Sequence, residues 1–355
     1  MEQTRIEKIF NQFNHNTSFK TEKELISGHI NDSYVIETQG EQSFVLQRIN
    51  HNVFKDVPRL INNKILVSAH LKSKFKDLSE AELSRKVLSF VACNDGAYFY
   101  RDETGNYWNL SVFVSDSFTH DVVDSETVAY EGGKLFGAFL NLTSDFNPER
   151  LIEVIPDFHD MSFRFSQFEA ALKQASEKRM ERAKFCIDKV FELKEEMHIL
   201  QHLKTSGQLK LRVTHNDTKI SNALFDKNDK GLCVIDTDTV MPGIIHYDFG
   251  DAIRTICNTA AEDETNLDLV TFNVAYYKAY KKGFLETMGE TLSPLELKYL
   301  PLGAKTMTFI MALRFLTDYL NNDIYYKTAY SEHNLNRSKN QFKLIQSFSE
   351  QLEHL

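Results

Sequence analysis

The segment between His215 and Asp238 limits the possible folds most, because only here do strands interrupt a half of the chain that is otherwise helical. Residues 209–213, 223–225 and 232–235 are short apolar runs with strand composition. Residues 226–231, Asp-Lys-Asn-Asp-Lys-Gly, have the composition of a turn. We therefore predict a strand, a polar loop and a β-hairpin in direct succession.

The predicted hairpin brings together polar residues that suit phosphoryl transfer. Asn222 enters the hairpin and Asp236 leaves it, so we expect the two side chains to be neighbours, with Asp217 one loop away. A carboxylate can accept the proton of an acceptor hydroxyl, and amide and carboxylate oxygens suit Mg²⁺. Taken singly, each residue is also typical of turns and strand ends. The combined pattern favours a phosphate-transfer site.

The rest of the chain predicts a small β-rich lobe followed by a larger helical lobe. Predicted strands lie at residues 24–30, 33–38, 43–49, 97–101 and 107–114, with a helix from Val57 to Leu71. Predicted helices cover residues 125–142, most of 163–203, and most of 266–355. We expect an α+β, bilobal architecture with a nucleotide-binding lobe at 1–115 and a helical lobe at 116–355, which holds the catalytic loop and the acceptor site. Such inter-lobe clefts are common ligand sites.

Composition narrows the function class. The 355 residues are 42% hydrophobic and 26% charged, as in ordinary globular proteins. The net charge of −9 argues against a nucleic-acid partner. An acidic cleft repels phosphate unless a metal ion bridges the carboxylates and the phosphate. No apolar run approaches the length of a membrane helix, and the N-terminus does not resemble a signal peptide. With four scattered cysteines, we expect a cytoplasmic protein without a membrane partner.

Two motifs resemble the aminoglycoside phosphotransferase and choline kinase superfamily, which has a bilobal protein-kinase-like fold. They are VTHNDTKISNALFD at 213–226 and VIDTDTVMPG at 234–243. The resemblance implies Asp217 as catalytic base, and Asn222, Asp236 and Asp238 as Mg²⁺ ligands. It implies His215 as structural support.

The sequence Asp248-Phe249-Gly250 matches a protein-kinase metal motif, but it does not directly follow the hairpin. We therefore assign the metal to Asp236 and expect Asp248 and Asp251 to anchor the loop. Asp251 resembles the family residue that braces the catalytic loop, and a helix-cap role for it is almost the same prediction.

The nucleotide-binding residues are less clearly marked. The segment at 27–33 could lie over phosphates, with Asn31 and Ser33 as donors. The superfamily places a phosphate-binding cation on the third strand, where this chain has Gln47 and Arg48. Alternation puts these two on opposite faces, so only one can face the cleft, and Arg48 could instead be a solvated charge. The hinge, with Val114, should bind adenine.

The acceptor site should lie in the helical lobe. Arg314 sits within an apolar helix, where it could bind sugar hydroxyls or pair with Asp318. Tyr325 and His29 are further candidates for sugar contacts. The motifs, with IPDFHD at 155–160, are most similar to the N-acetylhexosamine 1-kinases. This implies ATP and Mg²⁺ as cofactors and a sugar acceptor. Alternatives are choline, ethanolamine, homoserine, methylthioribose or aminoglycoside acceptors, or a non-catalytic pseudokinase.

Overall fold

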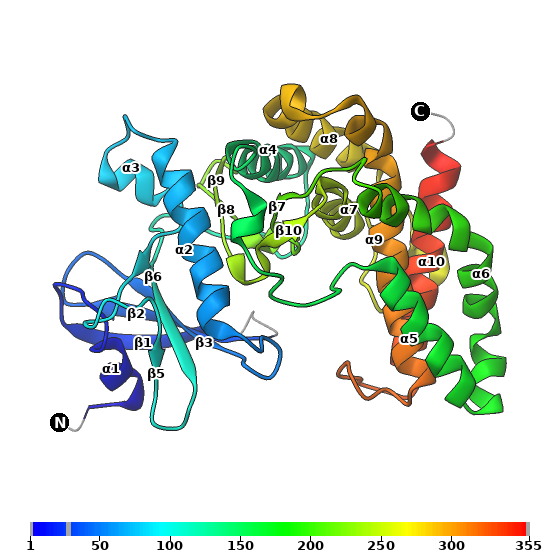
Figure 1. The fold of residues 1–355 in the computed structure, drawn as a ribbon, viewed down its shortest axis with the longest axis horizontal. Coiled ribbons are helices and arrows are strands. Elements are labelled where there is room, and N and C mark those ends of the chain that lie inside the picture. Colours follow the sequence, from blue (N-terminus) through cyan, green and yellow to red (C-terminus); the bar gives the residue numbers. More distant parts are fainter. Residues whose placement is uncertain (1–2, 26–29, 353–355) are drawn as a thin grey trace.

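The N-terminal part of the protein is built around one antiparallel sheet. The computed structural model describes residues 3–25 and 30–352, and Figure 1 shows the sheet at one end of the molecule. Its strands are β1 (Phe19–Leu25), β2 (Asp32–Thr38), β3 (Phe44–Ile49), β4 (Phe90–Val91), β5 (Tyr100–Arg101) and β6 (Tyr107–Val112). They lie in the order β1-β2-β3-β6-β4, with β5 also paired to β6.

The helices of the N-terminal part include one that links the sheet to the rest of the chain. They are α1 (Arg5–Phe10), α2 (Val57–Ser73) and α3 (Glu80–Ser84). Phe10 of α1 packs in one apolar cluster with Ile36 and Leu46 of the sheet. Leu60 of α2 lies in another cluster that contains Met241 from the C-terminal part. Helix α2 therefore contacts both the sheet and the strands around the candidate site.

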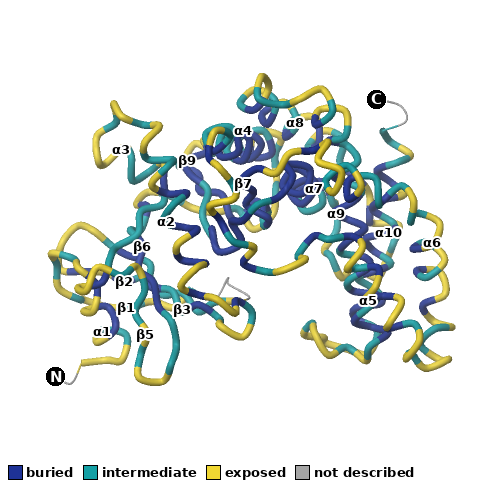
Figure 2. Tube along the Cα trace, viewed as in Figure 1, coloured by how far each residue is buried: buried dark blue, intermediate teal, exposed yellow. Residues whose placement is uncertain are grey.

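The C-terminal part is mainly helical. Its helices are α4 (Glu126–Leu142), α5 (Met161–Gln174), α6 (Glu177–Thr205), α7 (Ile245–Ile256), α8 (Val274–Met288), α9 (Pro294–Leu320) and α10 (His333–Leu352). In the described part of the chain, the short 3₁₀ segments are η1 (Pro148–Arg150), η2 (Ile220–Asn222), η3 (Thr237–Thr239), η4 (Leu267–Leu269) and η5 (Gly289–Thr291). Figure 2 shows α7 and much of α9 in the buried interior, which gives the lobe a helical core.

Glycines allow two of these helices to approach closely. A Cβ at Gly133 of α4 would lie 2.2 Å from the Tyr280 carbonyl oxygen, and one at Gly283 of α8 would lie 2.1 Å from the Tyr130 carbonyl oxygen. Neither position can hold a side chain without separating the helices.

Two small sheets interrupt the helices. Strand β7 (Arg212–Thr214) pairs with β10 (Met241–Gly243), and β8 (Ala223–Phe225) pairs with β9 (Gly231–Val234). A buried ion pair between Arg212 and Glu296 (2.8 Å) connects β7 to α9. These sheets hold the loop that carries the candidate site.

The observed elements confirm the α+β architecture and correct its details. The first strand begins at Phe19, and the predicted fourth strand is reduced to Tyr100–Arg101. Residues 163–203 are mostly helical as predicted, in two helices, because α5 ends before Ala175 and Ser176 caps α6. Residues 266–352 are mostly helical as predicted, in α8, α9 and α10. Among the described residues, no helix is both long and apolar enough to cross a membrane.

Candidate functional site

The candidate catalytic loop connects β7 to β8, and hydrogen bonds of the two small sheets hold its ends. Thr214 at the end of β7 is in register with Met241, and Ala223 at the start of β8 is in register with Val234. The Ile235 amide donates to the Asn222 carbonyl (2.9 Å). The hairpin therefore places Asn222 beside the segment that leads to Asp236, as its turn sequence predicts.

Asp217 lies in the middle of this loop and is held by two neighbours. The Asn222 amide nitrogen Nδ2 donates to the Asp217 carboxylate oxygen Oδ2 (2.9 Å) and to its carbonyl oxygen (2.8 Å). Lys219 Nζ lies 3.1 Å from the same Oδ2 atom, and 32% of the Asp217 side chain is exposed. The carboxylate is thus fixed in orientation and still accessible to a substrate.

Two buried carboxylates of α7 anchor the loop backbone. Asp248 accepts hydrogen bonds from the amides of His215 (2.7 Å) and Asn216 (2.8 Å). Asp251 accepts one from the Thr218 amide (2.9 Å). Burial raises the pKa of Asp248 to about 6 although the His215 charge and both amides oppose the increase. The Asp248-Phe249-Gly250 sequence is therefore part of a helix that anchors the loop, and Asp251 has the bracing geometry expected of it.

The ring of His215 supports the loop from the other side. One ring nitrogen lies 2.8 Å from the carbonyl oxygen of Ile235, and the Thr239 hydroxyl donates to the His215 carbonyl oxygen (2.7 Å). The residue is fully buried. His215 thus joins the catalytic loop to the end of the hairpin.

Asp236 and Asp238 form an acidic centre next to this loop. Burial, followed by the charges of Asp238 and Asp217, raises the pKa of Asp236 to about 7. The Thr237 hydroxyl between them is buried and has no hydrogen-bond partner among the described residues. No three acidic, histidine or cysteine side chains of the described residues converge as a complete metal cluster. Two carboxylates with the Asn222 amide oxygen nevertheless suit a hard divalent cation that keeps ligands from substrate phosphates.

The structure places Gln47 and Arg48 on opposite sides of β3. Arg48 forms an ion pair with Asp32 of the adjacent strand (Nε–Oδ2 2.6 Å), and 39% of its side chain is exposed. Gln47 Oε1 lies 3.4 Å from the ammonium of Lys64. Gln47 therefore faces the site, whereas Arg48 is bound by the sheet.

Lys64 of α2 is a buried cation that the sequence interpretation missed. It forms an ion pair with Asp238, and both side chains are only 3% exposed. Asn31 donates to the other carboxylate oxygen of Asp238 and accepts from the Asn50 amide (2.7 Å). A signal was present in the sequence, because Lys64 lies on the apolar face of α2 between Leu60 and Val67, where an unpaired charge is costly.

The remaining nucleotide-side candidates lie in the sheet and in the link that follows it. Ser33 of β2 is opposite Gln47 in the sheet register. Val114, in the predicted hinge, is buried in an apolar cluster with Leu224 and Leu232 of the hairpin. Val114 therefore packs against the β8–β9 hairpin.

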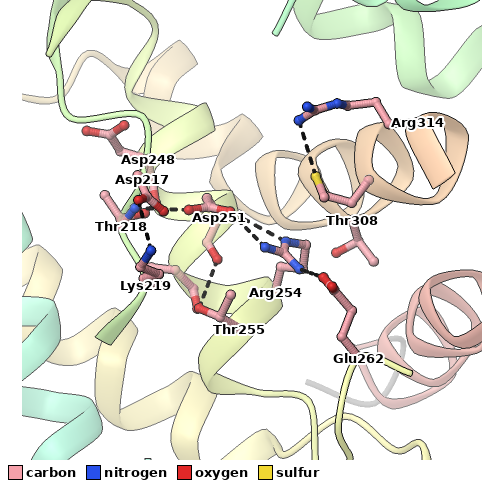
Figure 3. Close-up of polar contacts among 12 residues, drawn as sticks. Asp217, Thr218, Lys219, Asp248, Asp251, Arg254, Thr255, Glu262, Thr308 and Arg314 are labelled. Atoms are coloured by element: carbon pink, nitrogen blue, oxygen red, sulfur yellow. Dashed lines mark hydrogen bonds and ion pairs between the residues drawn. The ribbon is translucent and has the colours of Figure 1, made fainter. Parts of the chain in front are cut away.

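Of the acceptor-side candidates, Arg314 and Tyr325 lie among the described residues, and the structure tests one of the two alternatives for Arg314. The alternative pairing of Arg314 with Asp318 is wrong, because Asp318 accepts from the amides of Tyr325 (2.8 Å) and Tyr326 (3.0 Å) instead. The Arg314 guanidinium carbon lies 5.9 Å from the Tyr325 ring centre. Figure 3 shows the Arg314 side chain extending from α9 toward the side where Asp217 lies. His29 lies outside the described residues.

Comparison with known proteins identifies the class. Residues 21–284 match the family described as the phosphotransferase enzyme family, which is most of the chain. The chain belongs to this family, and the protein is a phosphotransferase.

Solved structures share the fold at low sequence identity. The microcompartment-associated aminopropanol kinase is 14% identical, with a TM-score of 0.65 and coverage of 98% of this chain and 97% of that one. "Amicoumacin kinase hAmiN in complex with AMP-PNP, Ca2+ and Ami" is 12% identical, with a TM-score of 0.64 and coverage of 96% and 92%. Choline kinase from Cryptosporidium parvum Iowa II is 13% identical, with a TM-score of 0.56 and coverage of 94% and 90%.

Proposed function

We propose that the protein is an ATP-dependent kinase that phosphorylates the anomeric hydroxyl of an N-acetylhexosamine, N-acetylglucosamine or N-acetylgalactosamine. The main support for phosphoryl transfer is the fixed carboxylate of Asp217, which accepts from Asn222 and lies 3.1 Å from Lys219. The loop that holds it is anchored by Asp248 and Asp251. The choice of acceptor rests on the motifs around Asp217 and Asp236, which resemble those of the N-acetylhexosamine 1-kinases.

In this proposal Asp217 accepts or orients the proton of the acceptor hydroxyl during direct in-line transfer. Burial lowers the pKa of Lys219, but the charges of Asp217 and Asp236 raise it by more, so Lys219 stays charged. A charged Lys219 offsets the repulsion between the Asp217 carboxylate and an incoming phosphate. The base and the phosphate can therefore share one site.

The acidic centre suits Mg²⁺. Asn222, Asp236 and Asp238 would hold the ion, which when bound neutralises charge on the transferred phosphoryl group. Burial and the neighbouring carboxylates raise the pKa of Asp236, and a divalent cation bound there would offset this concentration of negative charge. Asn31 and Lys64 hold Asp238 in position from the nucleotide side.

Lys64 is the proposed phosphate-binding cation, in place of a residue on β3. It is buried between Gln47 and Asp238, next to the candidate metal ligands. Arg48 is not assigned as the phosphate-binding cation, because it forms an ion pair with Asp32 on the other side of the strand. The AMP-PNP named with the similar amicoumacin kinase structure supports ATP as the donor. A buried cation at this place also argues against a pseudokinase that lacks a phosphate-binding group.

The test is an acceptor panel with ADP release as the readout. Purified protein with Mg²⁺ and ATP is given N-acetylglucosamine, N-acetylgalactosamine, choline, ethanolamine, homoserine, methylthioribose and an aminoglycoside. We expect the N-acetylhexosamines to be used most efficiently, and phosphorus NMR of the product to show phosphate coupled to the anomeric proton. A product phosphorylated at another hydroxyl, or a clear preference for a non-sugar acceptor, would refute the assignment.

A further inference from the structure

A cavity of about 480 Å³ lies between α2, α4 and strand β9. Figure 1 shows these three elements next to one another, on the side of α2 that leads to α3. Protein interiors contain few spaces larger than a water molecule. Small-molecule sites usually have volumes of about 300–1,000 Å³. The cavity is therefore large enough to hold a ligand.

The walls of this cavity are mostly apolar. The lining residues fall within 64–71 of α2 and 135–142 of α4, which is about 10 Å along each helix. The apolar side chains of the three elements that line it include Val67, Leu71, Leu135, Phe139, Leu232 and Val234. A space with such walls takes up an alkyl chain readily, because apolar surface is removed from water on both partners.

The charged residues that line the cavity are both lysines. Among the described residues that line it there is no Asp or Glu. Lys64 is neutralised by its ion pair with Asp238, whereas Lys86 is exposed and takes part in no ion pair within residues 3–25 and 30–352. Burial raises the pKa of Cys233 to about 12, and the charges of Lys86 and Arg85 oppose this increase. Since Cys233 also lines the cavity, the Lys86 ammonium lies close enough to attract an anionic group bound there.

The cavity is separate from the residues proposed for catalysis. Of the described residues that line it, none is the proposed base, a proposed metal ligand or the predicted hinge residue Val114. Lys64 and Thr237 line the cavity and also border the acidic centre. The cavity therefore adjoins the nucleotide side of the site without containing the groups that would bind the metal or the adenine.

We propose that this cavity binds a carboxylate with a medium-length alkyl chain, with the chain between α2 and α4 and the carboxylate beside Lys86. Burial of the chain supplies most of the affinity. Because Lys86 is exposed, the carboxylate keeps part of its hydration and avoids the cost of a fully buried charge. A cationic ligand is disfavoured by the two lysines that line the cavity. The ligand is neither the phosphate donor nor the acceptor of the proposed reaction.

The experiment is a calorimetric titration of the wild-type protein without nucleotide or acceptor, so its result does not depend on the proposed reaction. The probes are hexanoate, octanoate and decanoate, with decylammonium as the cationic counterpart of the longest chain. We expect one ligand per protein and a Kd that falls by about 10-fold for each two-carbon extension. Decylammonium should bind about 10-fold more weakly than decanoate. Absence of binding, or a Kd that does not change with chain length, would overturn the proposal.

Variants test the two ends of the ligand separately. Lys86→Gln should weaken decanoate binding by about 3–5-fold and leave the affinity for 1-decanol, its neutral analogue, unchanged. The matched control is Lys173→Gln, since Lys173 is an exposed lysine of α5 that does not line the cavity. Ala138→Phe places a ring where Ala138 lines the cavity and should weaken binding of decanoate and 1-decanol alike by about 10-fold or more. Urea unfolding shows whether this variant folds, and Ala138→Leu replaces it if it does not.

Two further outcomes would contradict the proposal. Equal decanoate binding by the wild-type protein, Lys86→Gln and Lys173→Gln would remove the carboxylate from Lys86 and leave only an unspecific apolar space. Competitive displacement of decanoate by ADP with Mg²⁺ would assign the cavity to the nucleotide site. We expect instead that decanoate stays bound when ADP is added, because the proposed metal ligands and the predicted hinge residue lie outside the cavity.

Discussion

Replacement of Lys64 by methionine tests how the nucleotide side of the site is built. The change keeps the apolar stem and removes the ammonium, which leaves the Asp238 carboxylate, 3% exposed, without its ion-pair partner. Breaking a buried pair by removing one partner costs about 3–5 kcal/mol. We expect the free energy of unfolding, measured by urea denaturation without nucleotide or metal, to fall by about 3–5 kcal/mol.

Stability and binding can be separated by a second change. Asp238→Asn in the Lys64→Met background removes the unpaired charge, so part of the lost stability should return because the two sites are coupled. Nucleotide affinity should not return, because the phosphate-binding cation is still missing. We expect ATP binding, measured by calorimetry, to stay about 10–100-fold weaker than in the wild-type protein.

A matched control makes this result interpretable. Lys173→Met removes an exposed lysine from α5 and should change neither stability nor ATP affinity appreciably. The reasoning is refuted if Lys64→Met is as stable as Lys173→Met and binds ATP with wild-type affinity. A fully stable Lys64→Met variant with weakened ATP binding would refute only the ion-pair energetics.

Three further perturbations test the packing, the sheet and the metal site. Gly133→Ala should lower the free energy of unfolding in urea by about 1–3 kcal/mol, because its Cβ would lie 2.2 Å from a backbone oxygen. The control is Gly289→Ala, whose new Cβ has no atom within 4 Å and should not destabilise the protein through packing. Burial opposes ionisation of Asp102, but hydrogen bonds led by those from Trp108 and Arg5 hold its pKa far below the usual range. Its contribution is thus present at neutral pH and is lost as pH falls below about 4, so the stability deficit of Asp102→Asn should shrink from pH 7 to pH 3; a deficit that is constant with pH would contradict this. Asp236→Asn should raise the Mg²⁺ concentration needed for half-maximal ADP release, and an unchanged Mg²⁺ dependence would remove Asp236 from the metal site.

Local sequence signals predicted the part of the site that is built locally. The turn at 226–231 and the apolar runs beside it fix the hairpin, because register in a short hairpin is set by its loop and its side-chain alternation. The hairpin in turn brings Asn222 next to the chain before Asp236. The two-residue strand β4 was missed, since Phe90–Val91 is a strand only through its pairing with β6.

Long-range pairings could not be predicted in the same way. Lys64 and Asp238 are 174 positions apart, so their ion pair depends on how α2 packs against the C-terminal part. The charge of Lys64 on an apolar helix face could have suggested a buried partner but not its identity. The alternative of an Arg314–Asp318 pair was wrong for a related reason, because backbone amides of the following loop bind Asp318 instead.

The most direct measurement of the central claim is acceptor-dependent ADP release by wild-type protein, Asp217→Asn and Asp188→Asn. Asp188 is an exposed carboxylate of α6 and serves as the matched control. With Mg²⁺, ATP and N-acetylhexosamine, we expect kcat of Asp217→Asn to fall by about 10²–10⁴-fold, with ATP binding largely kept and Asp188→Asn unchanged. Near-wild-type turnover by Asp217→Asn would contradict the assignment of Asp217 as the catalytic base.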